Sequence, residues 1–259
     1  NCSKNNQTWK KQLFSQNILI KKSQKDQIDI YFARANILHK EKNYKDSARY
    51  LQLANDLKLM LKPSKADLLI EKSRDLQNEC NKIEYNFKEN KKYPQSIFIV
   101  GMPRSGSTLI ESILSMNNCV KDLGEINILE ESFEEIRKDY KSSTIAEIYW
   151  KKVSNYVDTL TNTTNKWLFN YQYAGLIAKL IPNVKIIHSF RNPLDNILSI
   201  YRANFASGNE YSSSLIDCTK VYLDHEKIMN TYKEKYRKQI YDLNYDKLVI
   251  NPKKEIKDL

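Results

Sequence analysis

The chain has 259 residues, 41% of them hydrophobic, and a formal net charge of +11. This length and composition are enough for one large or two ordinary hydrophobic cores, so we expect a globular protein. No apolar run approaches the roughly 18 residues of a membrane-spanning helix, and the polar, lysine-rich start contains no signal peptide that can be recognised.

The positive charge is spread over helical stretches that also contain Glu, Asp and Asn. Such spreading is typical of solvated helix faces, so we expect no nucleic-acid partner. The cysteines are far apart and form no C-x-x-C pair, which argues against a zinc knuckle or a disulfide framework; they are Cys2, Cys80, Cys119 and Cys218. Free thiols suit a reducing compartment, and we predict a cytoplasmic location. A start at Asn1 and an end in a helical pattern suggest part of a longer protein.

The composition changes near residue 95, which predicts two domains. Residues 1–95 contain no glycine and have apolar residues at helical spacing, whereas residues 96–259 alternate β-rich runs with helices. In the first domain, Ile28 to Leu57 reads as a helical hairpin that turns near Asn43. A further helix is predicted from Ala66 to Phe87.

The hairpin has its small and large residues where a tetratricopeptide unit has them. The matching residues are Tyr31, Ala35, Leu38, Tyr44, Ser47, Leu51 and Ala54. Arg34 stands at a position that is usually apolar, and the proline that commonly closes a unit is missing. An ordinary α-hairpin therefore remains the alternative.

The second domain is predicted to be α/β, with a mainly parallel sheet flanked by helices. The predicted strands are Ile97 to Gly101, one that ends near Leu123, one near Trp167, Val184 to Phe190, and Gln239 to Asn244. The predicted helices are Ser107 to Met116, two or more within Ile126 to Leu160, Leu194 to Phe205, and Ser214 to Tyr236. Ligands of such sheets bind beyond the carboxyl ends of the strands.

The segment IFIVGMPRSGST, residues 97–108, reads as a strand followed by a phosphate-binding loop. It keeps the glycine spacing of the ATP- and GTP-binding loop G-x-x-x-x-G-K-[ST], from Gly101 to Gly106. Ser107 replaces the lysine that would reach the β- and γ-phosphates. The loop therefore predicts an anion with less charge than a nucleoside triphosphate.

A second strand exit, KIIHSFRNPLDNILSIYR, supplies another anion-binding candidate. Arg191 leaves the strand, and Ser199 lies about two turns into the following helix, so both side chains could hold one phosphate. The alternative is that Arg191 pairs with Asp195 and that Ser199 is merely buried. Two anion sites in one crevice predict a ligand that is phosphorylated at two separated positions.

Four segments, in this order, resemble the sulfotransferase family: GMPRSGSTLIESIL, LGEINIL, IPNVKIIHSFRNPLDNILSIY and LNYDKLV. The chain is most similar to bacterial sulfotransferases that carry tetratricopeptide repeats and are related to tyrosylprotein sulfotransferases. The resemblance implies 3′-phosphoadenosine 5′-phosphosulfate as the sulfuryl donor. It also implies that the 5′-phosphosulfate is held by Arg104, Ser105, Gly106, Ser107 and Thr108. The 3′-phosphate would contact Arg191 and Ser199, and Tyr245 would also contact the donor.

The resemblance further implies that Glu125 is the catalytic base, while Lys166 and Arg104 stabilise the leaving group. For Glu125 we expect burial, which would offset the neighbouring positive charges. The alternatives are a first-turn helix glutamate and, for Lys166, a surface lysine. Relatives commonly have Asp and Pro where Asn165 and Leu168 stand here.

His188 and His225 are less suited to be the base, because His188 alternates with apolar residues inside a strand and is expected to be a satisfied core or crevice histidine. We expect no metal ion. The acceptor would be a hydroxyl of a protein tyrosine, a glycan or a small molecule, and the repeat-like helices could bind a protein partner. Two other functions stay open: a nucleotide kinase or NTPase, which would require a lysine at position 107, and a non-catalytic scaffold.

Overall fold

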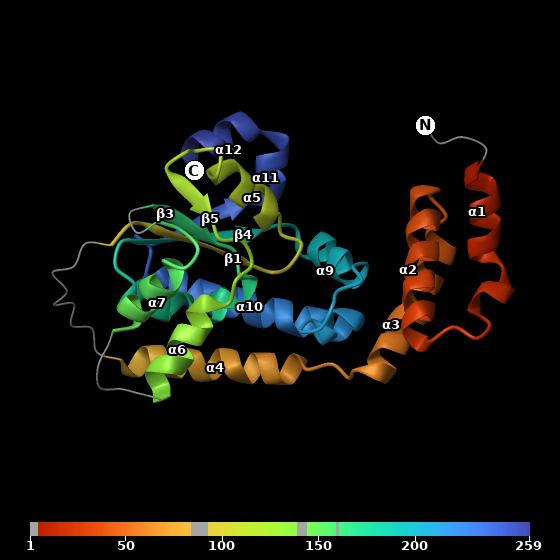
Figure 1. Ribbon diagram of the computed structural model, residues 1–259, viewed down its shortest axis with the longest axis horizontal. Helices are drawn as coiled ribbons and strands as arrows, with labels where there is room; N and C mark the ends of the chain where they lie inside the picture. The colour runs from red at the N-terminus through yellow and green to blue at the C-terminus, as the bar shows by residue number, and fades with distance from the viewer. Residues whose placement is uncertain (1–4, 84–92, 139–143, 159–160) are drawn as a thin grey trace. The chain divides into compact units, whose positions relative to one another are not determined.

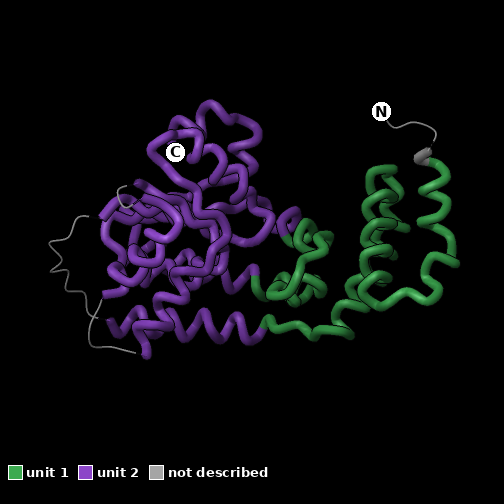
Figure 2. Tube along the Cα trace, in the orientation of Figure 1, with its two compact units in different colours: residues 1–66, 197–221 green, residues 67–196, 222–259 purple. Residues whose placement is uncertain are grey.

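The computed structural model describes residues 5–83, 93–138, 144–158 and 161–259. The chain divides into two compact units (Figure 2). Unit 1 comprises residues 1–66 and 197–221, and unit 2 comprises residues 67–196 and 222–259. The predicted boundary near residue 95 falls inside the range of unit 2, so the division into domains 1–95 and 96–259 stays a prediction. None of the described helices is long and apolar enough to cross a bilayer.

Unit 2 is built on a five-stranded parallel sheet, as the sequence predicts. The strand order is β2-β3-β1-β4-β5. The strands are β1 (Ser96–Gly101), β2 (Val120–Asp122), β3 (Asn162–Asn165), β4 (Val184–Phe190) and β5 (Ile240–Asn244). Because all strands run in one direction, their carboxyl ends meet at one edge of the sheet.

Helices cover both faces of this sheet in Figure 1. One face carries α5 (Ser107–Leu114), α11 (Tyr245–Ile250) and α12 (Pro252–Asp258). The other face carries α4 (Ala66–Lys82), α6 (Ile128–Lys138), α7 (Ile145–Val153) and the unit 2 part of α10 (Leu215–Lys235). A 3₁₀ helix (Leu168–Tyr173) and α8 (Ala174–Leu180) connect β3 to β4.

The apolar run Ser96–Gly101 becomes the central strand β1 because both of its faces are buried. Ile97 and Ile99 pack in a core cluster with Ile110 of α5 and Leu248 of α11. The alternate residues of β1 point to the opposite face and belong to a larger cluster that includes Leu176, Met229 and Ile240. The sheet thus separates two hydrophobic cores. The loops that follow its parallel strands all begin at the carboxyl edge.

Unit 1 contains the predicted helical hairpin. Its elements are α1 (Asn5–Phe14), a 3₁₀ helix (Gln16–Leu19), α2 (Gln24–Lys40), α3 (Tyr44–Leu61) and a second 3₁₀ helix (Glu210–Ser213). The turn falls at Asn43 as predicted, since the Asn43 side chain accepts a hydrogen bond from the Asp46 backbone N–H at 3.3 Å and caps α3. Ala35 and Ala54 are fully buried between the helices, so small side chains allow close helix packing.

Arg34 is buried in unit 1, and its guanidinium group has hydrogen-bond partners there. Its Nε and Nη2 atoms donate to the backbone oxygens of Leu13 and Ser15 at 2.8 and 2.9 Å. The guanidinium group also lies over the ring of Tyr50, 5.2 Å from its centroid. An arginine at this usually apolar position therefore ties α2 to the end of α1.

Several predicted boundaries were wrong by a few residues. The strand expected near Trp167 ends at Asn165, and Trp167 instead precedes a 3₁₀ helix. Helix α9 (Pro193–Tyr201) ends before the predicted end at Phe205, and α4 ends at Lys82. The predicted helix ends at Phe87 and Leu160 lie outside the described residues.

Candidate functional site

The residues that the sequence singles out follow the ends of all five strands of unit 2. Each strand ends at the same edge of the sheet because the pairing is parallel throughout. The residues just beyond these ends are Arg104 after β1, Glu125 after β2, Lys166 after β3, Arg191 after β4 and Tyr245 after β5. The fold therefore places candidates from five separated segments of the sequence at one edge of the sheet.

The loop between β1 and α5 contains two residues with a left-handed backbone conformation. Gly106, just before α5, has a φ of 93°, and Arg104 has a φ of 68°, both in the left-handed region. A Cβ atom on Gly106 would lie 2.0 Å from Cδ2 of Tyr245, so only glycine allows this ring to pack on the loop. The loop ends at the N-terminus of an eight-residue helix, where backbone N–H groups favour an anion.

Within the loop, Ser105 and Ser107 are buried, whereas Arg104 and Thr108 are exposed. The Oγ atom of Ser105 is buried and has no hydrogen-bond partner among the described residues. A buried hydroxyl of this kind is costly unless a ligand or water satisfies it. The loop thus offers a hydroxyl group, that of Ser105, to which no described residue is hydrogen-bonded.

Two polar residues that the sequence analysis did not single out hold the loop by hydrogen bonds to its backbone oxygens. Ser189 of β4 donates from its Oγ to the backbone oxygen of Ser105 at 2.7 Å. Asn196 of α9 donates from its Nδ2 to the backbone oxygen of Pro103 at 3.0 Å. Both side chains are buried, and the only signal in the sequence was a polar residue within an apolar stretch. Ser189 thus links the backbone of the loop to β4, and Asn196 links it to α9.

Arg191 lies against the Tyr245 ring, with its guanidinium carbon 5.4 Å from the ring centroid. Its Nη2 lies 3.8 Å from Asp195, and its Nε lies 3.9 Å from Asp246. The predicted alternative of an Arg191–Asp195 ion pair is therefore present, but at a distance near the limit for such pairs. Asp246 also accepts a hydrogen bond from the Asn192 backbone N–H at 2.7 Å, which fixes the exit of β4.

Ser199, the second predicted ligand of the 3′-phosphate, is half-buried in α9. Its residue range belongs to unit 1, whereas Arg191 belongs to unit 2. The predicted pairing of these two residues around one phosphate stays a prediction.

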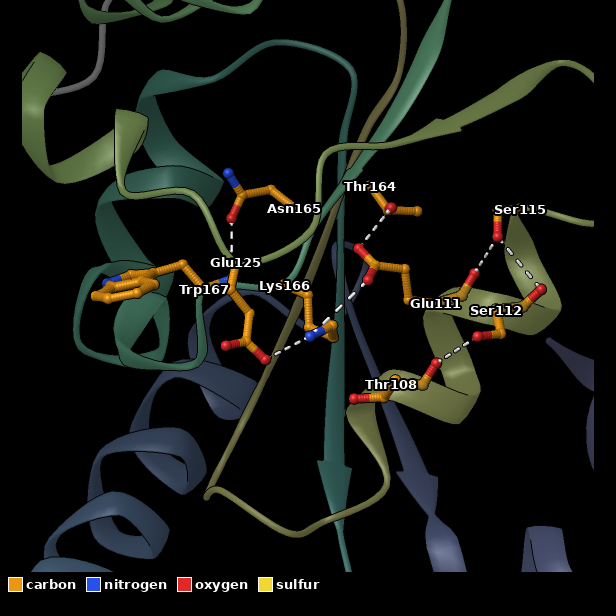
Figure 3. Close-up of polar contacts among 9 residues, drawn as sticks. All are labelled: Thr108, Glu111, Ser112, Ser115, Glu125, Thr164, Asn165, Lys166 and Trp167. Carbon is orange, nitrogen blue, oxygen red and sulfur yellow. Dashed lines mark hydrogen bonds and ion pairs between the residues drawn. The ribbon is translucent and has the colours of Figure 1, made fainter. Parts of the chain in front are cut away.

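Glu125 and Lys166 form an ion pair at the ends of β2 and β3 (Figure 3). The Lys166 Nζ atom lies 2.6 Å from Glu125 Oε1. Backbone hydrogen bonds continue the strand pairing up to this point: Leu123 N–H donates to Thr164 O at 3.0 Å and Lys166 N–H donates to Gly124 O at 2.9 Å. The main chain therefore fixes the two charged side chains side by side.

The burial of this pair differs from the expectation. The Lys166 side chain is only 6% exposed, which is inconsistent with a surface lysine. The Glu125 side chain is 58% exposed, so the predicted burial of the candidate base is wrong. Its proton-accepting group faces solvent on one side and an ammonium group on the other.

Glu111 of α5 is a second carboxylate near Lys166, which the sequence analysis did not single out (Figure 3). Its Oε2 lies 3.9 Å from Lys166 Nζ, and its Oε1 accepts a hydrogen bond from Thr164 Oγ1 at 3.0 Å. Burial raises the pKa of the Glu111 carboxyl, while the Thr164 hydroxyl and the Lys166 charge oppose the shift. In the sequence, the signal for Glu111 was an acidic residue among the apolar residues of a predicted helix.

Asn165 stands where the family resemblance leads us to expect an aspartate, and its hydrogen bonds use both ends of the amide. Its Oδ1 accepts from the Trp167 backbone N–H at 3.1 Å and from Asn170 Nδ2 at 2.9 Å. Its Nδ2 donates to the backbone oxygen of Ile126 at 3.2 Å, a bond that an aspartate could not form. The amide thereby joins the exits of β2 and β3 around Lys166.

The sequence matches the model of the Sulfotransferase family over residues 94–147 and 126–259. A protein of Aquifex aeolicus (strain VF5) is 30% identical over 186 residues, a match that covers 63% of this chain and 24% of that protein. The chain thus matches about a quarter of the length of this relative.

Two solved structures show similarity at low sequence identity. Sulfotransferase STF1 from Mycobacterium tuberculosis H37Rv is 13% identical, with a TM-score of 0.42 over 83% of this chain and 76% of that chain. Sulfotransferase STF9 from Mycobacterium avium is 11% identical, with a TM-score of 0.42 over 81% of this chain and 71% of that chain.

Proposed function

Because the chain belongs to the sulfotransferase family, we propose that it transfers a sulfuryl group from 3′-phosphoadenosine 5′-phosphosulfate to a hydroxyl acceptor. The observation that carries the proposal is the arrangement at the carboxyl edge of the sheet. There, an anion-binding loop, two arginines and a carboxylate–lysine pair follow the ends of parallel strands of one unit. The bound donor supplies an activated sulfuryl group for attack by the acceptor oxygen.

The residues of the β1–α5 loop suit the phosphosulfate end of this donor. Ser105 has a buried Oγ with no hydrogen-bond partner among the residues that the structure describes. Gly106 lets the chain take a left-handed conformation just before α5, where backbone N–H groups favour an anion. Ser107 stands where a triphosphate-binding loop has lysine. A sulfuryl group carries less charge than a γ-phosphoryl group, so we propose that backbone donors, hydroxyls and Arg104 suffice without a magnesium ion.

The residues after β4 and β5 suit the 3′-phosphate. We assign Arg191 and Ser199 to bind it, with Tyr245 packed between Arg191 and the loop. The cation–π contact and the two neighbouring carboxylates hold the guanidinium group in place. An incoming phosphate would compete with these carboxylates at distances of 3.8 and 3.9 Å, which are weak ion pairs.

The chemical step is assigned to the pair at the ends of β2 and β3. Glu125 takes the proton from the acceptor hydroxyl, a role that its exposed carboxylate makes accessible to an incoming molecule. Lys166 is buried and held between two carboxylates, so its ammonium group can stabilise the negative charge of the departing phosphate oxygen. Arg104 shares this stabilisation at the loop.

For the acceptor, we propose a hydroxyl of a protein tyrosine, a glycan or a small molecule. We also propose that the helical hairpin of unit 1 is tetratricopeptide-like and binds a protein partner, in a protein of the cytoplasm related to tyrosylprotein sulfotransferases. The unit contains a pocket of about 510 Å³ lined by charges of both signs, including Lys58, Lys62 and Glu210, around the apolar Ile28 and Phe205. Charged groups of both signs around apolar side chains suit a peptide-like ligand.

Isothermal titration calorimetry with 3′-phosphoadenosine 5′-phosphate tests the donor assignment. We expect binding that does not change when Mg²⁺ is added, and displacement by the sulfated donor. ATP binding that requires Mg²⁺ would instead support a kinase or NTPase. Incubation of the chain and a radiolabelled donor with extracts of the source organism then tests transfer and identifies the class of acceptor.

A further inference from the structure

A buried cluster of metal-binding side chains lies on the face of the sheet opposite the β1–α5 loop. It consists of His188 on β4 together with His225 and Glu226 on α10. Ser189 points to the loop, so the preceding His188 points to the other face because strand residues alternate. His188 is 0% exposed and His225 is 1% exposed, which places both imidazoles in the interior of unit 2.

The polar atoms of this cluster have unmet hydrogen-bonding capacity. The atoms His188 Nε2, both ring nitrogens of His225, and Glu226 Oε1 are buried and have no hydrogen-bond partner among the described residues. His225 Nδ1 and Glu226 Oε1 lie 3.3 Å apart, but without the geometry of a hydrogen bond. Each such buried group destabilises the fold unless something satisfies it, and several next to one another indicate a shared occupant.

We propose that His188, His225 and Glu226 bind a divalent transition metal ion, of which Zn²⁺ is the best match. One candidate ligand atom from each residue lies within 4.8 Å of the others. Two ligands at bond lengths of about 2.0–2.1 Å from a tetrahedral zinc ion are about 3.3 Å apart, which matches the distance of 3.3 Å between His225 Nδ1 and Glu226 Oε1. Two imidazoles and a carboxylate form a recurrent ligand set for this ion, with a fourth position left for water.

The surroundings of His188 support the assignment. Its Nδ1 lies 2.9 Å from Asp242 Oδ1, and a proton on Nδ1 would leave the lone pair of Nε2, which has no described hydrogen-bond partner, free to bind a metal ion. A carboxylate behind a metal-bound histidine is a common arrangement that fixes the tautomer. Lys233 Nζ lies 3.2 Å from the same Asp242 oxygen and neutralises that carboxylate. Glu226 is then the acidic group whose charge the metal ion would balance.

Aromatic rings enclose the cluster. The rings of Tyr171 and His225 meet edge to face with centroids 4.8 Å apart, and Phe190 stacks on His188 at 5.6 Å. Glu226 retains 30% exposure of its side chain and provides the route for an ion to enter. A metal ion there would tie α10 to β4, the strand that ends just before Arg191. The site does not depend on the proposed donor or acceptor.

Metal titration of the untagged 259-residue chain tests this site. After removal of metal by a chelator and dialysis, Zn²⁺ is added in competition with a chromophoric chelator, and Co²⁺ is added separately to observe the visible absorption of a tetrahedral complex. We expect one ion per wild-type chain. We expect at least about tenfold weaker binding in Glu226→Gln and His225→Gln. The remaining histidine, in His39→Gln, serves as the matched control and should bind as the wild type does.

Glu226 is partly exposed, so Glu226→Gln remains informative if His225→Gln fails to fold. A wild-type chain that takes up no Zn²⁺ or Co²⁺ would overturn the proposal, and a buried water molecule would then satisfy the cluster. Wild-type affinity in both Glu226→Gln and a folded His225→Gln would also overturn it, since the ion would then be held elsewhere, such as at the cysteine thiols. Loss of binding in these variants but not in His39→Gln would support it.

Discussion

The two halves of the carboxyl edge of the sheet are built in different ways. At the ends of β1, β4 and β5, the features are mainly those of backbone geometry: a left-handed glycine, the N-terminus of α5 and a tyrosine ring packed on the loop. At the ends of β2 and β3, the features are charged side chains that neutralise one another, with Lys166 between Glu111 and Glu125. The first half suits anion binding, and the second suits proton transfer.

This difference determines how substitutions should act. Changes at the ends of β2 and β3 should affect turnover more than donor binding, because these side chains are assigned to the chemical step. Changes at the ends of β1, β4 and β5 should affect donor affinity first. A variant that affects both properties equally would show that the two halves act as a single region.

The largest effect is expected for Glu125→Gln. If this carboxylate takes the acceptor proton, its replacement by an amide should lower turnover about 10²- to 10⁴-fold. Donor affinity should stay nearly constant, because Glu125 lies on the side of Lys166 that is exposed to solvent. Steady-state transfer rates and calorimetry of nucleotide binding provide the two measurements.

Glu71→Gln is the control for this variant, since Glu71 is exposed on α4 of the same unit. It should leave both properties unchanged. Turnover of Glu125→Gln within about threefold of the wild type would assign the base to another group.

Arg191→Ala should have the next largest effect, on affinity. Loss of a charge-assisted contact to phosphate should weaken binding of the 3′-phosphorylated nucleotide about 10- to 100-fold. The analogue with a 3′-hydroxyl lacks this contact and should lose much less. Calorimetry with both nucleotides measures the difference, with the exposed Arg237→Ala as the control for general charge. Equal losses for the two nucleotides would remove Arg191 from the 3′-phosphate.

Gly106→Ala tests whether backbone geometry carries the anion loop. A left-handed φ of 93° is strained for alanine, and its Cβ would collide with the Tyr245 ring at 2.0 Å. We expect about tenfold weaker nucleotide binding and a loss of stability of about 1–3 kcal/mol, measured by calorimetry and by denaturant unfolding.

Gly208→Ala is the matched control for this substitution. Gly208 has a φ of 99°, but a Cβ atom there would meet nothing within 4 Å. It should therefore show only the cost of backbone strain, about 1–2 kcal/mol, with nucleotide binding unchanged. If Gly208→Ala weakens binding as much as Gly106→Ala does, the effect of the latter does not come from the Tyr245 contact.

The two halves also differ in how far the sequence predicts them. The β1–α5 loop was predictable because its conformation requires glycine and small residues at fixed spacing, and because the apolar run before it forms a central strand. The parallel sheet followed from the alternation of strands and helices. Helix ends such as that of α9 were missed because tertiary packing decides where a helix stops.

The ends of β2 and β3 were predictable only through family resemblance. Glu125 and Lys166 are 41 residues apart, and their contact arises from the pairing of two strands whose residues are mostly polar. Glu111 reaches Lys166 from α5 and was missed altogether. Ser189 and Asn196 were missed because their hydrogen bonds to the loop join residues 84 and 93 positions apart in the sequence. No local pattern records contacts of this kind.

The smallest effect is expected for Glu111→Gln, which tests whether the second carboxylate only positions Lys166. The amide can still accept the hydrogen bond from Thr164, so we expect turnover to fall by less than about tenfold with donor affinity unchanged. Burial raises the pKa of the Glu111 carboxyl above its value in the unfolded chain, so ionisation costs more in the folded state. The stabilising effect of this residue is therefore complete below the unfolded pKa, near about 4.3, and is lost as the pH rises through the folded value.

Relative to Glu111→Gln, the wild type should accordingly lose stability over the interval from about pH 4.3 up to the raised pKa of Glu111 in the folded chain. Urea unfolding of both proteins across this interval measures the difference, and Thr164→Val shows how much depends on the hydroxyl. A wild type that instead gains stability over Glu111→Gln as the pH rises would mean that attraction to Lys166 outweighs burial. In that case Glu111 would be a full member of the charged pair, and the end of β3 would be held by a three-charge network.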